Sequence, residues 1–367
     1  MTIRNLELKG SKLLSIDLLR FIASFSVIFY HYGFYGYFAR GRLHDLDFIT
    51  PYGAIYAVPL FFIISGFCIH WASRHNVMDQ QLDLRKYFRR RLYRIYPPYV
   101  FALLFSMAVM AMKPERDIVG IDDFFLKLTF THVYSVKYFN SINLILWTVA
   151  VEMSFYILYP LYYRLRRLLG LYNTLCIVFA ISTLSSFLLD RFGNDTLPVR
   201  WFFLNFWFMW CLGAAVADLA MTGEKTLHLG KKFFLGLFVL LAVYITERLT
   251  FRDKTFFLDQ MHCLAGMVPL LLFLKYEEVF VRYRKALVLF SSLGTAGYSI
   301  YLLQEPLIAC KNLFMKMTGT NGNLLIHAVG FPVVLLMCYI AYRFVERPYM
   351  EFGKKKITPN NYLSNNK

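Results

Sequence analysis

Apolar runs long enough to cross a lipid bilayer recur along almost the whole chain, separated by short polar segments. A transmembrane helix needs about 20 mostly apolar residues, and ten stretches approach or exceed that length. We therefore predict an all-α fold, a polytopic transmembrane bundle of about ten helices. The predicted stretches are 13–37, 52–72, 95–113, 142–162, 171–190, 200–221, 232–248, 256–274, 289–312 and 324–344.

Basic side chains are distributed unevenly over the segments between these stretches. With a cytoplasmic N-terminus, the inner segments hold 26 Lys and Arg residues and the outer segments hold 13. Cytoplasmic loops characteristically carry such an excess. The bias and the even helix count together predict that both termini are cytoplasmic. We treat residues 1–348 as a single transmembrane domain and residues 349–367 as a short polar cytoplasmic tail.

Composition supports the membrane class. Hydrophobic residues make up 58% of the chain and charged residues only 17%, against about 25% charged in soluble domains. The net charge of +17 would suggest a nucleic-acid partner in a soluble protein. Here the charges lie between apolar runs and no nucleic-acid-binding motif accompanies them, so we expect contact with the lipid bilayer and no nucleic-acid partner. The six cysteines form no CxxC pair, and we expect packed thiols rather than disulfides or a metal site.

The first predicted helix carries ionisable side chains in the run SIDLLRFIASFSVIFYHYG. Such a residue inside a membrane is costly unless paired and therefore marks a candidate functional site. Arg20 and His31 are eleven residues apart, which places them on nearly one helix face and about 16 Å apart along the axis. Asp17 lies three residues before Arg20, near enough to pair with it. In the alternative, Asp17 and Arg20 snorkel at the cytoplasmic end and His31 is an interfacial residue.

The fourth predicted helix begins LWTVAVEMSFYILYP and contains a carboxylate among apolar residues. Glu152 should face the bundle interior, where it could orient His31 or bind a sugar hydroxyl. Trp147 precedes it near the outer boundary of the membrane. The alternative for Glu152 is a structural ion pair with a Lys or Arg on another helix.

The most basic inner segment, RKYFRRRLYRIYPPY, contains Arg91 and Arg94. At this spacing the two guanidinium groups share a helix face and could grip phosphates. In the alternative they are ordinary anchors at the cytoplasmic membrane surface.

Two weaker signals lie elsewhere in the chain. Ser65 and Gly66 in the second predicted helix are small enough to let another helix approach closely. Gln304 and Glu305 are polar positions inside an apolar run, and Pro306 directly after them interrupts helix hydrogen bonding.

Taken in order, these landmarks resemble the acyltransferase-3 family of multi-pass membrane enzymes, which acylate hydroxyls of bacterial surface polysaccharides, lipopolysaccharide and some small molecules. The resemblance covers nearly all of residues 13–348. Two departures concern positions where the family often has other residues: Met153 and Ser154 follow Glu152, and Gln304 replaces a histidine. The matching landmarks are Arg20-x10-His31, FFIISGF (Phe61 to Phe67), Arg91-x-x-Arg94 with IYP, LWTVAVE (Leu146 to Glu152) with FYILYP, GYSIYLL and the terminal VERP.

The resemblance implies an acyl-CoA donor, acetyl-CoA being the first candidate, with no bound cofactor. It implies a hydroxyl acceptor on a surface or lipid-linked polysaccharide, such as O-antigen or exopolysaccharide, and a bacterial inner-membrane location. We expect Arg20, Arg91 and Arg94 to bind the donor on the cytoplasmic side, His31 to act as general base, and Glu152 to orient it. Trp147 and Gln304 are expected to contact substrate.

Two questions stay open from sequence. The acyl group could pass directly to the acceptor or through a covalent acyl-histidine. The competing functional class is a glycan or glycolipid transporter, since ten helices and intramembrane charges suit either; the basic donor-facing residues favour the enzyme. A non-enzymatic scaffold fits poorly with a buried glutamate.

Overall fold

The computed structural model describes residues 13–33, 49–73, 82–112, 120–192, 201–222, 256–320 and 323–357. All regular structure within these ranges is helical, which confirms the all-α prediction. Five helices there are long and apolar enough to cross a membrane, and two shorter apolar helices accompany them. The longer helical segments are α2 (Leu14–His31), α4 (Ile49–Ala72), α6 (Leu84–Ala111), α9 (Leu146–Leu169), α10 (Leu171–Phe192), α11 (Phe203–Thr222), α13 (Phe256–Lys275), α16 (Gly297–Met317) and α17 (Leu324–Ala341).

Shorter elements connect and extend these helices. Between α6 and α9 lie α7 (Ile121–Leu128), the 3₁₀ turn η2 (His132–Tyr134) and α8 (Val136–Phe139). Before α16 lie α14 (Glu277–Arg282) and α15 (Val288–Thr295). After α17, the π-helical segment η4 (Tyr342–Glu346) leads into α18 (Arg347–Ile357).

Two predicted stretches differ clearly from the structure, and a third cannot be compared with it. The stretch 289–312 is not one helix: α15 ends at Thr295 and α16 begins at Gly297. Helix α6 begins at Leu84 rather than at residue 95, because the side chain of Asp83 caps it by accepting a hydrogen bond from the backbone N–H of Lys86. The stretch 232–248 lies outside the described residues.

The expected polar tail begins as a helix. Residues up to Ile357 belong to α18, and α18 packs against α6. At Gly353 a β-carbon would come within 2.9 Å of the Tyr93 side chain. Helix α18 thus continues past residue 348, the predicted end of the transmembrane domain, and packs closely against α6.

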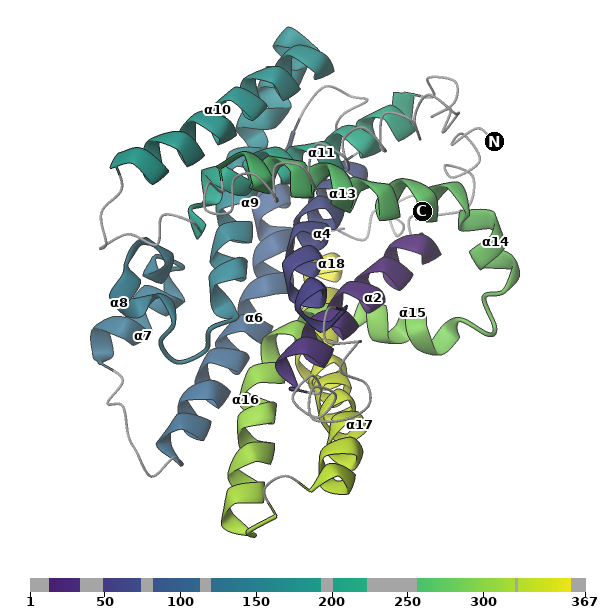
Figure 1. Cartoon of the computed structure of the whole chain (residues 1–367). Coiled ribbons are helices and arrows are strands. Elements are labelled where there is room, and N and C mark those ends of the chain that lie inside the picture. Colours follow the sequence, from purple (N-terminus) through teal and green to yellow (C-terminus); the bar gives the residue numbers. More distant parts are fainter. Residues whose placement is uncertain are drawn as a thin grey trace, which may run out of the picture.

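Helices α4 and α11 cross closely at the centre of the bundle (Figure 1). A β-carbon on Gly66 would lie 1.9 Å from the carbonyl oxygen of Trp210, and one on Gly213 would lie 1.9 Å from the carbonyl oxygen of Ile63. Each glycine therefore lets the other backbone approach, as small residues do in membrane helix pairs. The role predicted for Gly66 is confirmed.

Helix α2 is fixed by the segment that precedes α16. Glu277 of α14 accepts hydrogen bonds from the backbone N–H groups of Leu14 and Ser15, at 2.8 and 2.7 Å. A carboxylate at this end satisfies free donors and complements the helix dipole. Farther along, Gly294 of α15 packs against the carbonyl of Asp17, where a β-carbon would meet oxygen at 1.7 Å. These contacts set the position of the ionisable face of α2.

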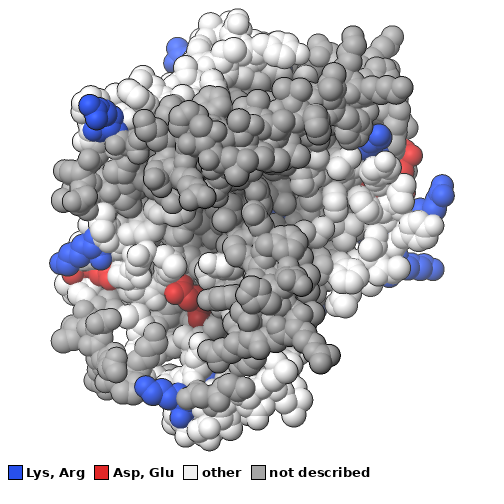
Figure 2. All heavy atoms as spheres, in the orientation of Figure 1, with Lys and Arg blue, Asp and Glu red and all other residues white. Residues whose placement is uncertain are grey.

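The outside of the bundle is largely apolar. Many large hydrophobic side chains on α10 and α17 are exposed, among them Phe192 at 75% and Leu325 at 72%. On the face in Figure 2, the described surface is mostly uncharged, and Lys and Arg lie toward its periphery. Exposed apolar helices of this kind are suited to a lipid environment.

Candidate functional site

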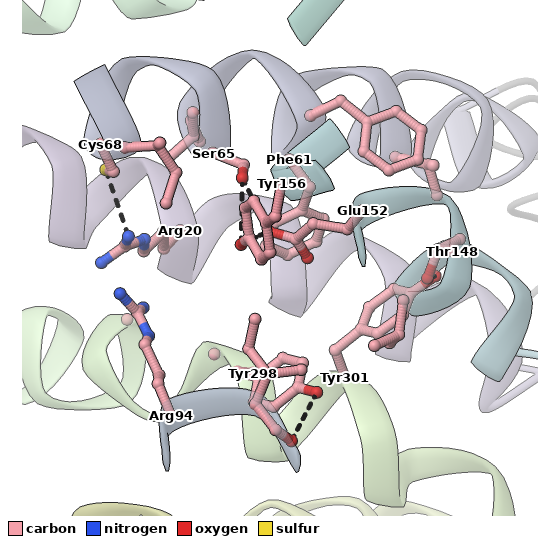
Figure 3. Close-up of a pocket in the computed structure, with 18 of the residues that line it drawn as sticks. Arg20, Phe61, Ser65, Cys68, Arg94, Thr148, Glu152, Tyr156, Tyr298 and Tyr301 are labelled. Carbon is pink, nitrogen blue, oxygen red and sulfur yellow. Dashed lines mark hydrogen bonds between the residues drawn. The ribbon is translucent and has the colours of Figure 1, made fainter. Parts of the chain in front are cut away.

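A pocket opens between α2, α4, α6, α9, α15 and α16, and it contains about 850 Å³ of space including its mouth. Along α4 it extends from Val58 to Ile69, about 16 Å of helix. Figure 3 shows its polar side chains approaching from several helices. Its polar and titratable lining residues are Arg20, Ser65, Cys68, Arg94, Thr148, Glu152, Tyr156, Thr295, Tyr298 and Tyr301.

A carboxylate with two hydroxyl partners lies on one wall of the pocket. Oε1 of Glu152 accepts a 2.7 Å hydrogen bond from Ser65 and a second, short one from Tyr156. Trp210 Nε1 in turn donates to Ser65 Oγ at 3.2 Å. Glu152 is thus held by residues of α4 and of its own helix one turn on, and both hydroxyl partners were missed by sequence analysis.

Two arginines from different helices face the same space. Arg20 of α2 and Arg94 of α6 both line the pocket, and their guanidinium groups point toward one another in Figure 3. Arg20 pairs with Asp17 at 3.8 Å, as the sequence predicted, and donates to the Cys68 sulfur at 3.2 Å. Arg20 is therefore tethered on one side, and its remaining donors can serve a ligand.

A further carboxylate lies behind the arginines. Glu346, in the terminal VERP motif, is fully buried and accepts a 2.6 Å hydrogen bond from Ser299. The charges of Arg94 and Arg20 act on it electrostatically. It ends the π-helical segment η4, and such segments are frequent at functional sites. The sequence marked VERP as a landmark but did not identify Glu346 as a site residue.

Arg91 does not share the pocket with Arg94. Its guanidinium lies 4.2 Å from the centre of the Tyr87 ring and donates to the Tyr87 carbonyl at 3.4 Å. The side chain is buried and lines a separate groove, which shares Tyr156 with the pocket. Residues three apart on a helix differ by about 60° in direction, and here the two arginines line different cavities.

Trp147 and Gln304 are buried but do not line the pocket. Trp147 packs against Trp201, Phe206 and Phe139, with ring centres 4.6, 6.3 and 5.9 Å away. Gln304 donates to the Tyr301 carbonyl at 3.1 Å, and its Oε1 has no hydrogen-bond partner among the described residues.

His31 is the last residue of α2 and is partly exposed. Its ring lies edge-on against Tyr30, and it is not one of the described residues that line the pocket. The hydrogen bonds of Glu152 in the described part of the chain go to Ser65 and Tyr156, so the expected contact with His31 does not occur in this arrangement. Arg20, Arg94 and Glu152 are the predicted residues that the fold brings together.

The two tyrosines of the GYSIYLL motif complete the pocket. Tyr298 donates to the Ile95 carbonyl at 3.2 Å, and Tyr301 lies 3.0 Å from the Thr148 hydroxyl, which donates to it. Both rings line the cavity. The spacing of the two tyrosines, three residues apart and so on one face of a helix, was the signal that could have identified them.

Charges in and around the pocket nearly balance. Two guanidinium groups, Arg20 and Arg94, face three carboxylates, Asp17, Glu152 and Glu346. In the described ranges, no group of three His, Cys, Asp or Glu side chains is arranged to hold a metal ion. Such a mixed, partly enclosed site can bind an ester or thioester carbonyl, direct a hydroxyl and exclude bulk water.

The segment between α6 and α9 holds a second set of buried polar groups, outside the membrane-spanning helices. Lys127 is fully buried and its ammonium donates to the carbonyls of Tyr138 and Phe139, at 3.0 and 3.3 Å. Burial lowers the pKa of Lys127 to about 8. Burial and the nearby Lys127 charge lower the pKa of His132 to about 3, so this imidazole is neutral at physiological pH.

Comparison with known sequences identifies the family. The sequence model of the acyltransferase-3 family, described as an acyltransferase domain, matches residues 13–343. The chain belongs to this family. The resemblance inferred from the ordered motifs is confirmed. No solved structure matches the chain.

Curated relatives agree with this assignment. The chain is 26% identical over 336 residues to the O-acetyltransferase OatA of Staphylococcus aureus, covering 83% of this chain and 54% of that protein. It is 23% identical over 376 residues to the peptidoglycan O-acetyltransferase OatA of Listeria monocytogenes, covering 92% and 56%. Acyltransferase MdmB of Streptomyces mycarofaciens is 28% identical over 164 residues, covering 42% and 40%. The chain spans about half the length of the two OatA proteins.

Proposed function

We propose that this chain is a multi-pass membrane O-acyltransferase that moves an acyl group, acetyl being the first candidate, from acyl-CoA to a hydroxyl of a glycan. The observation that carries the proposal is the pocket in which Arg20, Arg94 and Glu152 meet. Three helices supply these groups to one space in a member of an acyltransferase family. The names of the O-acetyltransferase relatives favour acetyl as the acyl group.

The donor would enter from the cytoplasmic side. With the N-terminus inside, Arg20 and Arg94 lie in the cytoplasmic halves of their helices, where they would attract the phosphates or the thioester end of acyl-CoA. The 16 Å run of pocket along α4 suits an extended pantetheine arm. Apolar residues Phe61 and Phe62, which also line it, would pack against that arm.

The chemical step is a simple acyl transfer. The acceptor oxygen attacks the thioester carbonyl, a C–O bond forms, and the C–S bond breaks. The proton leaves the acceptor hydroxyl for a base and then reaches the thiolate, so that CoA departs as the free thiol. The Arg20 guanidinium, about 16 Å along α2 from His31, would hold the donor on the cytoplasmic side of the reacting carbonyl.

Two residues are candidates for handling the proton of the acceptor hydroxyl. His31 is the general base of our sequence prediction, near the outer end of α2, where an outward-facing glycan would approach. Glu152 is the carboxylate among the described lining residues of the pocket, and its two hydroxyl partners fix its orientation. We assign His31 the base role and Glu152 the positioning of the acceptor hydroxyl.

We propose a glycan hydroxyl on a surface or lipid-linked polysaccharide as the acceptor, in a bacterial inner membrane. One relative is a peptidoglycan O-acetyltransferase, which favours a cell-envelope glycan. The tyrosine rings of Tyr298 and Tyr301 offer faces on which a sugar ring could stack.

The decisive experiment uses the purified full chain in lipid nanodiscs. Free CoA thiol released from acetyl-CoA is measured with and without a cell-envelope glycan fraction. We expect acceptor-dependent release by the wild type, and a loss of at least about 100-fold in His31→Ala and Glu152→Gln, with unchanged insertion and thermal stability. Wild-type rates in His31→Ala would overturn its role as base. Absence of release from the wild type with every envelope fraction would overturn the proposed activity.

A further inference from the structure

A groove on the exposed surface of α6 and α9 has no role in the proposed reaction. Three arginines line it, Arg85, Arg89 and Arg91, together with apolar residues of both helices, and no Asp or Glu is among its described lining residues. It shares Tyr156 with the candidate active site. The groove is thus a positively charged site that lies back to back with the pocket.

Its charge and its apolar surface are separated along the helix axis. Arg85 and Arg89 lie one turn apart within the first two turns of α6, and both are exposed. No salt bridge joins either of them to an acidic side chain of the described chain. Farther along the helix axis, toward the middle of the membrane, Leu92 is 52% exposed and Ile157 of α9 is 65% exposed. Cationic groups at the membrane boundary therefore continue into an open apolar surface.

This profile fits one class of ligand. A phosphate at the boundary would find two free guanidinium groups, and a hydrocarbon chain would cover Leu92 and Ile157 at bilayer depth. A soluble nucleotide would leave those apolar side chains uncovered. Basic pockets between helices on the cytoplasmic side are a known basis for anionic lipid recognition.

We propose that the α6–α9 groove binds an anionic glycerophospholipid, with its phosphate between Arg85 and Arg89 and an acyl chain along Leu92 and Ile157. Arg91 is held by Tyr87 and adds a third positive charge to the lining of the groove. Because Tyr156 forms part of both walls, a bound lipid would pack against the residue whose hydroxyl holds Glu152.

The test measures lipid binding rather than activity, so its outcome is independent of the acyltransferase proposal. Purified full-length protein in detergent is titrated with phosphatidylglycerol or phosphatidylcholine, and bound lipid is counted by native mass spectrometry. We expect phosphatidylglycerol to bind more tightly than phosphatidylcholine. The double variant Arg85→Gln/Arg89→Gln should weaken phosphatidylglycerol binding about thirtyfold. The matched control Arg282→Gln/Arg284→Gln, which removes two exposed arginines elsewhere, should bind like the wild type.

Two further arms identify the source of the phosphate. Ile157→Gln, on the exposed apolar wall, should weaken phosphatidylglycerol binding although it changes no charge. Glycerol 3-phosphate and CoA, which lack the lipid chains, should fail to displace the lipid at millimolar concentration. Equal binding by the double variant and the wild type, equal binding of the two lipids, or displacement by CoA would each overturn the proposal.

Discussion

The hydroxyl of Ser65 donates a 2.7 Å hydrogen bond to Oε1 of Glu152, which joins α4 to α9 inside the pocket. Tyr156 donates to the same oxygen. A carboxylate held by two neutral donors keeps a fixed direction, and its other oxygen can meet a substrate hydroxyl. This relationship makes Glu152 the best-defined reactive group of the candidate site.

The two hydroxyls should act as one unit. Ser65→Ala and Tyr156→Phe are each expected to lower the rate of acyl transfer about tenfold, because each removes one hydrogen bond to a charged group. The double variant should lose less than the product of the two effects, since the donors share one acceptor atom. Steady-state kinetics on the three variants checks this, and strictly multiplicative losses would show that the hydroxyls act separately.

Arg91 and Arg94 offer a matched pair for donor binding. Arg94→Gln should raise the donor KM about tenfold, because a charge-assisted contact is lost in the pocket. Arg91→Gln should leave KM within about twofold, since its guanidinium stacks on Tyr87 outside the pocket. Initial rates measured over a range of acyl-CoA concentrations give the KM of each variant. Equal increases in KM would instead support the prediction from sequence that both arginines bind the donor.

The crossing of α4 and α11 predicts a sharp steric effect. Gly66→Ala places a methyl group against the Trp210 backbone and should lower the apparent Tm by several degrees, an overpacking cost of about 1–3 kcal/mol. The control is Gly297→Ala, where a β-carbon would meet its nearest neighbours at an ordinary 3.6 Å. Thermal unfolding in the same detergent compares them; similar Tm values for both variants would contradict the close crossing.

Helix positions and the family could be read from sequence because both depend on local features. Apolar length identifies a membrane helix, and the ordered motifs identified the acyltransferase-3 family. The break at Ala296 escaped the pattern because apolar residues continue through it, so hydropathy does not mark the turn between α15 and α16. The early start of α6 escaped because its first turns are charged rather than apolar.

The candidate site was only partly predictable. Intramembrane charge marked Arg20 and Glu152, since such residues are costly without a function. Arg91 and Arg94 line different cavities, and Tyr156 of α9 belongs to the lining of both. The spacing of the two arginines along α6 does not report where α9 packs. From sequence, Ser65 was interpreted as a packing residue beside Gly66. Its role in the site follows from the packing of α4 against α9, which brings its hydroxyl within 2.7 Å of Oε1 of Glu152.

Lys127 gives a prediction for pH. Its pKa falls to about 8 in the folded chain, against about 10.4 for an unperturbed lysine. Between these values the unfolded state binds more protons than the folded state, so this group makes stability rise as pH increases from about 8 to 10.4. Below pH 8 and above 10.4 its contribution is constant.

The difference between wild type and Lys127→Met isolates that contribution, because other titrating groups are common to both. The apparent Tm of both proteins is measured from pH 7 to 10.5. The Tm of the wild type minus that of Lys127→Met should increase as pH increases. A constant difference across this range would mean that Lys127 titrates with the same pKa in both states.

We infer that acyl transfer depends on the pocket that contains Glu152. The most direct measurement is transfer of label from acetyl-labelled acetyl-CoA to an envelope glycan fraction by the purified chain in nanodiscs, with wild type, Arg91→Gln and Glu152→Gln compared. We expect labelled glycan with the wild type and Arg91→Gln, and a loss of at least about 100-fold with Glu152→Gln at unchanged Tm. Labelling by Glu152→Gln at the wild-type rate would contradict it.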